Sequence, residues 1–232
     1  MKKLLSAPYF YKFTEKLLPS LALVTLVCLV TALYLGLWWA PEDYQQRDAF
    51  RILYVHVPCA LWSLGFYVGM SLAGIIYYIW RIKVFAWLSQ AAILPGMLLT
   101  GLALATGSIW GKPMWGTWWV WDARLTSELI LFFLFFAQYL LAQTIQNEHK
   151  RYQACALLGI VGLLDIPIIH YSVEWWQTLH QGSTLLRTEG PLIHPSMRLP
   201  LWLSLVGVLG WGATLALLKV QTHILRKTTV TE

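Results

Sequence analysis

Six long runs of apolar residues restrict this chain to a membrane-spanning fold. They lie near residues 20–39, 52–80, 84–109, 125–146, 153–171 and 199–218. A helix of about 20 apolar residues crosses a hydrocarbon core of about 30 Å. Charged residues make up only 12% of the chain, roughly half of their share in soluble domains. We therefore predict an all-α integral membrane protein, in which residues 1–232 form a single bundle of six transmembrane helices.

The distribution of Lys and Arg predicts the orientation of the bundle. Six spans put both termini on one side of the membrane, and eleven of the 17 cationic residues fall on that side. Those eleven are residues 2, 3, 12, 16, 81, 83, 150, 151, 219, 226 and 227, and the other six are residues 47, 51, 112, 124, 187 and 198. Because cytoplasmic connections carry the excess of Lys and Arg, we expect both termini in the cytoplasm. The first span follows several lysines without a small-x-small cleavage pattern, so we expect it to remain as the first helix.

Several functional classes do not fit this pattern. The net charge of +6 comes from short basic clusters between apolar runs, which set membrane topology and do not indicate nucleic-acid binding. Cys28, Cys59 and Cys155 lie inside apolar runs without a CxxC or CxxCH motif, so neither a thiol relay nor covalent haem attachment is supported. The chain has no GxxxxGK[ST] motif, so we expect no ATPase site of its own. The longer connections lie on the outer side, at residues 40–51, 110–124 and 172–198, and we expect the chemistry there.

Tryptophan is concentrated in one of these outer segments. Residues 110–122 contain five of the 14 tryptophans, at positions 110, 115, 118, 119 and 121. Gly111, Pro113 and Gly116 predict that the third helix does not continue through this segment, so residues 110–124 should form a loop. Nine tryptophans fall at the outer face and only Trp80 and Trp87 at the inner face. An interfacial aromatic belt is usually two-sided, so the asymmetry favours a platform for a flat apolar ligand, with the belt as the alternative.

The end of the tryptophan-rich segment carries charged residues. Asp122 precedes the fourth span and has the position of a helix N-cap, and Glu128 follows near the positive end of the same helix. Arg124 and Lys112 flank the tryptophans and could pair with carboxylates of a ligand, Arg124 through a bidentate contact. Ordinary solvation is the alternative for Lys112.

Four of the six histidines lie near the outer ends of spans, namely His56, His170, His180 and His194. His56 stands in Tyr-Val-His-Val-Pro at the start of the second span, and His180 follows a Trp-Trp pair in the last outer segment. Either could be an axial ligand to haem iron, with a packing histidine as the alternative. The spacing of the four does not rank them. Asp165 lies inside the fifth span, where a carboxylate indicates either a functional group or a hydrogen-bonded structural one.

These motifs resemble the CcmC family of system I cytochrome c maturation over nearly the whole chain. The resemblance is strongest at residues 110–128, WGKPMWGTWWVWDARLTSE, which is similar to the family's WWD signature. It implies that haem b is bound as cargo at the periplasmic face, between the tryptophan-rich loop 110–124 and two histidines. On this basis His56 and His180 are the axial ligands, whereas His170 and His194 do not match the ligand positions. The remaining binding residues implied are Trp110, Trp115, Gly116, Trp118, Trp119, Trp121, Asp122 and Arg124.

The resemblance also implies a cellular context. The chain is expected in the bacterial inner membrane, loading haem onto the periplasmic chaperone CcmE together with the ATPase CcmA, the permease CcmB and the small protein CcmD. It is expected to be a haem-binding subunit and not an enzyme, because two histidines fill both axial positions of the iron.

Three alternatives remain. WWD-type cytochrome c synthase components such as CcmF and CcsA share the signature, but CcmF has many more spans and length argues against both. A b-type electron-transfer subunit would take its ligands from within transmembrane helices, often in helix-spaced pairs. A scaffold would use the tryptophans as a protein docking surface.

Overall fold

The computed structural model describes residues 6–180 and 193–229, and its regular secondary structure there is helical. Six segments are long and apolar enough to cross a membrane: Ala7–Trp39, Asp48–Trp80, Lys83–Trp115, Ala123–Thr144, Glu148–Trp175 and Pro195–Lys227. The prediction of an all-α chain with six potential spans is therefore confirmed.

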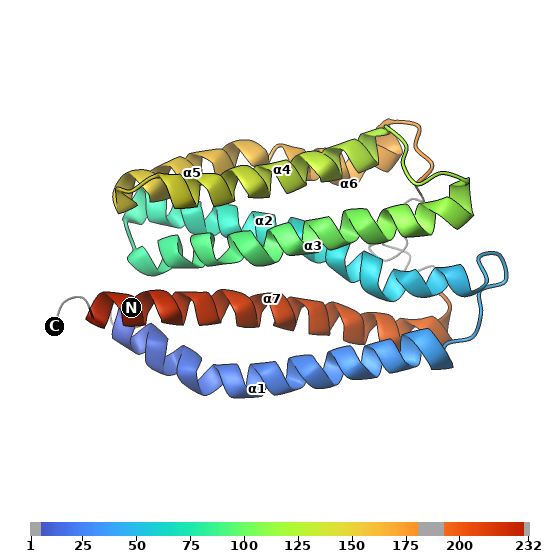
Figure 1. Cartoon of the computed structure of the whole chain (residues 1–232), viewed down its shortest axis with the longest axis horizontal. Helices are drawn as coiled ribbons and strands as arrows, with labels where there is room; N and C mark the ends of the chain where they lie inside the picture. The colour runs from blue at the N-terminus through green and yellow to red at the C-terminus, as the bar shows by residue number, and fades with distance from the viewer. Residues whose placement is uncertain (1–5, 181–192, 230–232) are drawn as a thin grey trace.

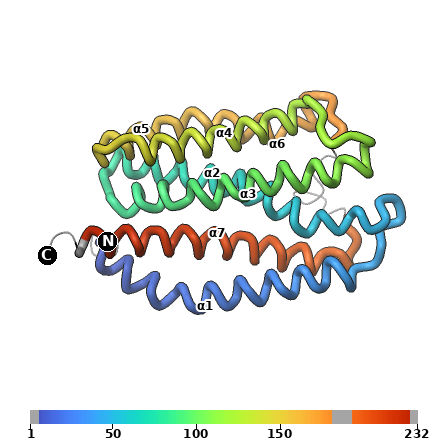
Figure 2. The backbone as a smooth tube through the Cα atoms, viewed as in Figure 1, coloured from blue at the N-terminus to red at the C-terminus, as the bar shows by residue number. Residues whose placement is uncertain are grey.

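The helices lie in three rows (Figure 1). The middle row is α2 (Leu53–Trp80) with α3 (Lys83–Trp115). The outer rows are α1 (Ala7–Tyr34) with α7 (Pro195–Thr229), and α4 (Ala123–Thr144) with α5 (Glu148–Gly162) and α6 (Asp165–Trp175). The start of α1 and the end of α7 lie at the same end of the bundle, as the tube in Figure 2 traces. We call this the terminal end, and the opposite one the site end.

Two short elements complete the path at the site end. A π-helical turn, Leu35–Trp39, continues α1, and a 3-10 turn, Asp48–Ile52, leads into α2. Arg51 joins them, because its Nη1 donates to the carbonyl of Gly36 at 3.0 Å and its Nε to Asp48 at 2.7 Å. The polypeptide between the first two spans is therefore held against the bundle.

The third helix is longer than the sequence analysis predicted. It continues through Gly111 and Pro113 to Trp115, so the expected loop 110–124 begins at Gly116 and the first part of it is helical. Pro113 stands near the end of α3 and removes only the hydrogen bond to the carbonyl four residues earlier. Gly116 ends the helix, since its φ of 77° is in the left-handed region and its N–H donates to the carbonyl of Lys112 at 3.0 Å.

The fifth span is interrupted, which the sequence analysis did not predict. It consists of α5 and α6, and Leu163 and Leu164 form the turn between them. Asp165 begins α6, and its Oδ2 is buried without a hydrogen-bond partner among the described residues. Pro167, in the first turn of α6, suits a helix start, because its missing N–H would have no partner there.

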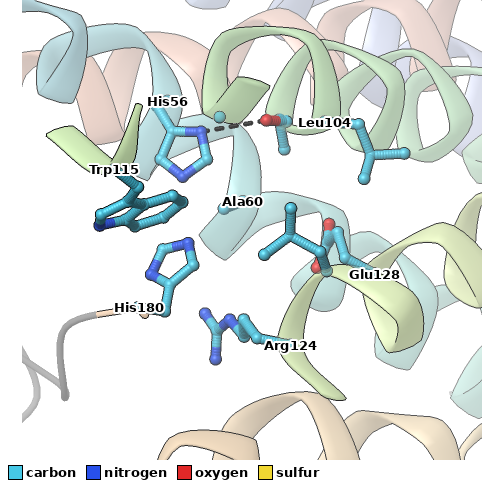
Figure 3. Close-up of a pocket in the computed structure, with 10 residues that line it drawn as sticks. His56, Ala60, Leu104, Trp115, Arg124, Glu128 and His180 are labelled. Atoms are coloured by element: carbon cyan, nitrogen blue, oxygen red, sulfur yellow. Dashed lines mark hydrogen bonds between the residues drawn. The ribbon is translucent and has the colours of Figure 1, made fainter. Parts of the chain in front are cut away.

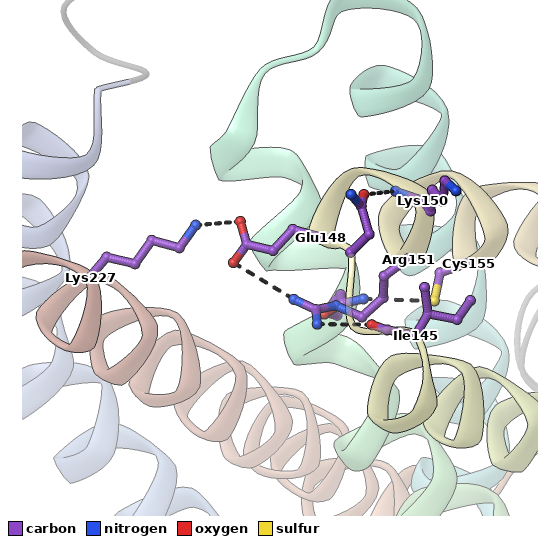
Figure 4. Close-up of polar contacts among 8 residues, drawn as sticks. Ile145, Glu148, Lys150, Arg151, Cys155 and Lys227 are labelled. Atoms are coloured by element: carbon purple, nitrogen blue, oxygen red, sulfur yellow. Dashed lines mark hydrogen bonds and ion pairs between the residues drawn. The ribbon is translucent and has the colours of Figure 1, made fainter. Parts of the chain in front are cut away.

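Polar contacts at the terminal end fasten the α4–α6 row to α7 (Figure 4). Lys227 Nζ donates to Glu148 Oε2 at 2.6 Å, and Arg151 lies 3.8 Å from Oε1 of the same carboxylate. Asn147 caps α5, because its side-chain oxygen accepts from the N–H of Lys150 at 3.0 Å. The contact between Lys227 and Glu148 joins residues 79 positions apart in the sequence, at the end remote from the site.

The core between α3 and α4 allows a stability test at Gly96. A Cβ at this position would overlap the ring of Phe135, a side chain with no exposed surface. Overpacking of a filled core costs about 1–3 kcal/mol, so we expect Gly96→Ala to lower the Tm of the detergent-purified protein by several degrees. Gly69→Ala is the control, because a Cβ there meets nothing within 4 Å. Equal Tm values for the two variants would contradict this packing.

Candidate functional site

The imidazole of His56 is held by one face of α3. His56 lies in the first turns of α2, and only 8% of its surface is exposed. Its Nδ1 lies 3.0 Å from the carbonyl oxygen of Ala103 and 3.1 Å from Thr106 Oγ1. A carbonyl can only accept, so Nδ1 carries the proton and Nε2 keeps a free lone pair. A Cβ at Gly107 would lie 3.0 Å from Cε1 of His56, so glycine at this position lets the ring approach the helix backbone closely.

The imidazole of His180 faces that of His56 (Figure 3). His180 follows α6, and its backbone N–H donates to Thr178 Oγ1 at 2.9 Å. The two ring centroids are 6.2 Å apart, with 24° between the ring planes, and Figure 3 shows a ring nitrogen of each directed toward the other. Burial, and to a lesser extent Arg124 and His56, lower the pKa of His180 to about 4, and Asp122 opposes the shift. His180 is therefore neutral at pH 7, the form that binds metals.

A pocket surrounds the two imidazoles at the site end. Its lining residues come from α2, α3, α4 and the segment after α6: His56, Ala60, Ala103, Leu104, Gly107, Trp115, Arg124, Leu125, Glu128 and His180. The walls are mainly apolar, and Trp115 lies edge-on to His180 with 5.4 Å between ring centroids. Within residues 6–180 and 193–229, no three His, Cys, Asp or Glu side chains converge on one point. The two imidazoles offer two nitrogen donors, the number that the axial positions of a metalloporphyrin can take.

Arg124 and Glu128 form the polar side of the pocket, one turn apart on α4. Arg124 Nη1 donates to the carbonyl of Ile169 on α6 at 2.6 Å, which holds the guanidinium beside the pocket. Glu128 Oε1 accepts from Ser63 Oγ on α2 at 3.0 Å. The sequence analysis identified Arg124 as a binding residue but gave Glu128 only a position near the helix start. Residues spaced i, i+4 lie on the same face of a helix, so this spacing could have predicted that Glu128 lies beside Arg124.

The structure brings together four of the ten residues expected at the site: His56, His180, Trp115 and Arg124 line the pocket. The other six do not line it. Asp122 is the N-cap of α4, as expected, since its Oδ1 accepts from the N–H of Leu125 at 2.8 Å. Gly116 ends α3.

The tryptophans of the segment between α3 and α4 are directed to different surroundings. Trp118 and Trp121 are 56% and 75% exposed, and Trp119 lies edge-on to Trp121 with 5.4 Å between ring centroids. Lys112 Nζ lies 6.0 Å from the centroid of the Trp118 ring and also donates to the carbonyl of Gly116 at 3.0 Å. The exposed indoles are therefore available to a ligand edge or to another protein.

Neither of the other two outer histidines lines the pocket. His170 is exposed on α6 and packs edge-on against Tyr171, with 4.7 Å between ring centroids. His194 is exposed before α7, and its Nδ1 is 2.8 Å from Ser196 Oγ. The sequence analysis missed the α3 wall of the pocket, Ala103, Leu104 and Gly107, for which the only signal is the spacing of small residues one turn apart.

Comparisons with known proteins show the family to which the chain belongs. The family model CcmC, described as "Heme exporter protein C", matches residues 1–232. The "Heme exporter protein C" of Escherichia coli strain K12 is 46% identical over 219 residues, which cover 94% of this chain and 88% of the relative. That of Haemophilus influenzae is 46% identical over 218 residues, with the same shares of the two chains. A "Putative cytochrome c biosynthesis ccmC-like mitochondrial protein" of Marchantia polymorpha is 43% identical over 172 residues, 74% of this chain and 72% of the relative. The chain therefore belongs to the CcmC family of heme exporter proteins, membrane proteins that handle haem in cytochrome c maturation.

Proposed function

We propose that this protein binds haem b between His56 and His180 at the periplasmic face of the bacterial inner membrane and loads it onto the chaperone CcmE. The observation that carries the proposal is the pair of facing imidazoles, with ring centroids 6.2 Å apart. Two metal–imidazole bonds of about 2 Å each, plus the distance from each nitrogen to its ring centre, give a separation on the order of 6 Å. The pair thus has the spacing of two axial ligands of one iron.

The protonation of both rings supports this role. His56 donates from Nδ1 to a backbone carbonyl, the usual arrangement of a metal-binding histidine, which orients Nε2 and raises its basicity. The lowered pKa of His180 keeps this ring neutral at pH 7, so no proton must leave it before the iron binds.

The remaining pocket residues suit a porphyrin with acidic side chains. Ala60, Leu104 and Leu125 provide apolar walls, and Trp115 an aromatic one. Arg124 is the cation beside the imidazoles and would pair with a haem propionate. Trp118, Trp119 and Trp121 would form a platform at the surface, where the edge of the porphyrin is presented to the chaperone. Gly116 and Asp122 would set the two ends of this platform, and Trp110 would support His56.

The proposed orientation follows the charge distribution. The sequence analysis assigns eleven of the 17 Lys and Arg residues to the side of the termini, so we place the terminal end in the cytoplasm and the site end in the periplasm. Energy for any movement of haem would come from partners, CcmA and CcmB, with CcmD completing the complex. With both axial positions filled, the haem is cargo, because no position remains for oxygen chemistry.

Transfer of haem from the purified protein to CcmE tests the proposal. We expect the protein, purified in detergent without CcmE, to give the absorption spectrum of low-spin haem. After addition of haem-free CcmE and separation of the two proteins, the haem should be found with CcmE. Haem that stays on the chain and is reduced by a quinol would instead support the electron-transfer alternative. Absence of haem from the wild-type protein would refute the proposal.

A further inference from the structure

A tight turn between Leu35–Trp39 and Asp48–Ile52, at the site end, fixes the backbone of Gln46. Asp43 Oδ1 accepts from the N–H groups of Gln45 and Gln46 at 2.9 and 2.8 Å, and its carbonyl accepts from the N–H of Arg47 at 3.0 Å. Arg47 has a φ of 50°, which closes the turn. Side chains such as Asp43 stabilise turns by bonding to backbone N–H groups two and three residues later. The turn from Asp43 to Arg47 thus fixes the backbone position of Gln46.

Gln46 reaches from this turn to the end of α3. Its Oε1 accepts from Trp110 Nε1 at 2.9 Å, a contact between residues 64 positions apart. Gln46 is half-buried, whereas its neighbour Gln45 is exposed. An indole N–H that is shielded from water usually finds a hydrogen-bond partner. Here the partner comes from the segment between the first two spans, whereas Trp110 belongs to α3. The hydrogen bond therefore restricts rotation of the Trp110 ring.

The restricted indole lies against His56. The ring centroids of Trp110 and His56 are 5.7 Å apart, at an interplanar angle of 78°. Trp110 continues the face of α3 that holds this imidazole, one turn beyond Thr106 and Gly107. The His56 ring thus has hydrogen bonds from Nδ1 on one side and the edge contact with Trp110 toward the surface.

We propose that Gln46 is a positioning residue for the iron ligand, acting through Trp110 to hold the His56 imidazole in the orientation that binds haem. The inference rests on the proposed function, because it explains the fixed orientation of His56 by the role of this residue as a haem ligand. Gln46 itself is not among the residues that line the pocket. Its loss leaves both imidazoles in place but frees the indole, so the His56–iron bond breaks more often and haem leaves faster.

The test measures the rate at which haem leaves the full-length protein for excess apomyoglobin, together with the EPR spectrum of the ferric haem. Gln46→Leu, which removes the acceptor oxygen, should release haem about 3- to 10-fold faster and shift the low-spin g values. The effect is smaller than the roughly 10–100-fold cost of losing a group bonded directly to a ligand. Gln46→Glu keeps an acceptor oxygen and should behave as the wild type. Gln45→Leu is the matched control in the same turn.

A second variant tests the same bond from its other side. Trp110→Phe keeps an aromatic edge beside His56 but removes the donor N–H, and should match Gln46→Leu. The double variant should be no worse than either single one, because residues that act through one bond are not additive. The inference is overturned if Gln46→Leu releases haem as slowly as Gln45→Leu. It is also overturned if Gln46→Glu releases haem as fast as Gln46→Leu. Neither result would contradict haem binding by the wild type. Absence of low-spin haem from the wild type would refute the proposed function itself.

Discussion

Replacing His56 by alanine is expected to remove low-spin haem from the purified protein and to lower its haem affinity more than about 100-fold. Loss of an outer partner of a metal ligand costs roughly 10–100-fold in affinity, and this change removes the ligand itself. His180→Ala should have an effect of the same size, because the two imidazoles face each other across one pocket. The measurements are the absorption spectrum and a haem titration of each variant.

Two other histidines at the site end are the controls. His170 and His194 are exposed and do not line the pocket, so His170→Ala and His194→Ala should keep the spectrum and affinity of the wild type. Loss of haem with His194→Ala, and its retention with His56→Ala, would show that the ligand assignment is wrong.

Simultaneous replacement of Trp118, Trp119 and Trp121 by alanine is expected to block loading of CcmE while the axial ligands still hold haem. An interface tryptophan that contributes strongly to binding is worth about 2 kcal/mol or more, which is roughly 30-fold in affinity. Because two of these indoles are more than half exposed, the triple variant should transfer haem at least about 30-fold more slowly. The measurement is the rate at which haem appears on added CcmE.

The control for the triple variant is a pair of tryptophans elsewhere at the site end. Trp175 and Trp176 are 56% and 49% exposed and belong to the end of α6. Their joint replacement by alanine should leave the transfer rate within about twofold of the wild type, as for surface changes away from an interface. Unchanged loading after loss of Trp118, Trp119 and Trp121 would refute the platform.

The features that could be predicted from the sequence depend on local composition. Span number follows from run length and hydropathy, and the N-cap role of Asp122 follows from its position before an apolar run. The end of α3 was predicted wrongly, because Gly111 and Pro113 were expected to interrupt it. Both residues stand in the last two turns of α3, where Pro113 removes only one backbone hydrogen bond, so the helix tolerates them.

The features that escaped prediction depend on how distant helices align. Gly107 matters because it faces His56 from another helix, and Gln46 because it bonds to an indole 64 residues away. The sequence around each of these residues does not indicate which distant residue it will contact. The spacing of the histidines left four candidates open, the family resemblance ranked them, and the structure brings His56 and His180 into one pocket.

The pairing of α1 with α7 has a consequence for biosynthesis. α1 packs mainly against α7, yet α2 to α6 lie between them in the chain (Figure 1). During translation α1 enters the bilayer long before its partner leaves the ribosome, so its inward face stays in lipid until α7 is inserted. α2 and α3 are consecutive and can associate as a hairpin at once, since contacts between near neighbours in the chain form first. Nascent chains arrested before α7 should therefore contain a folded α2–α6 unit with an undocked first helix.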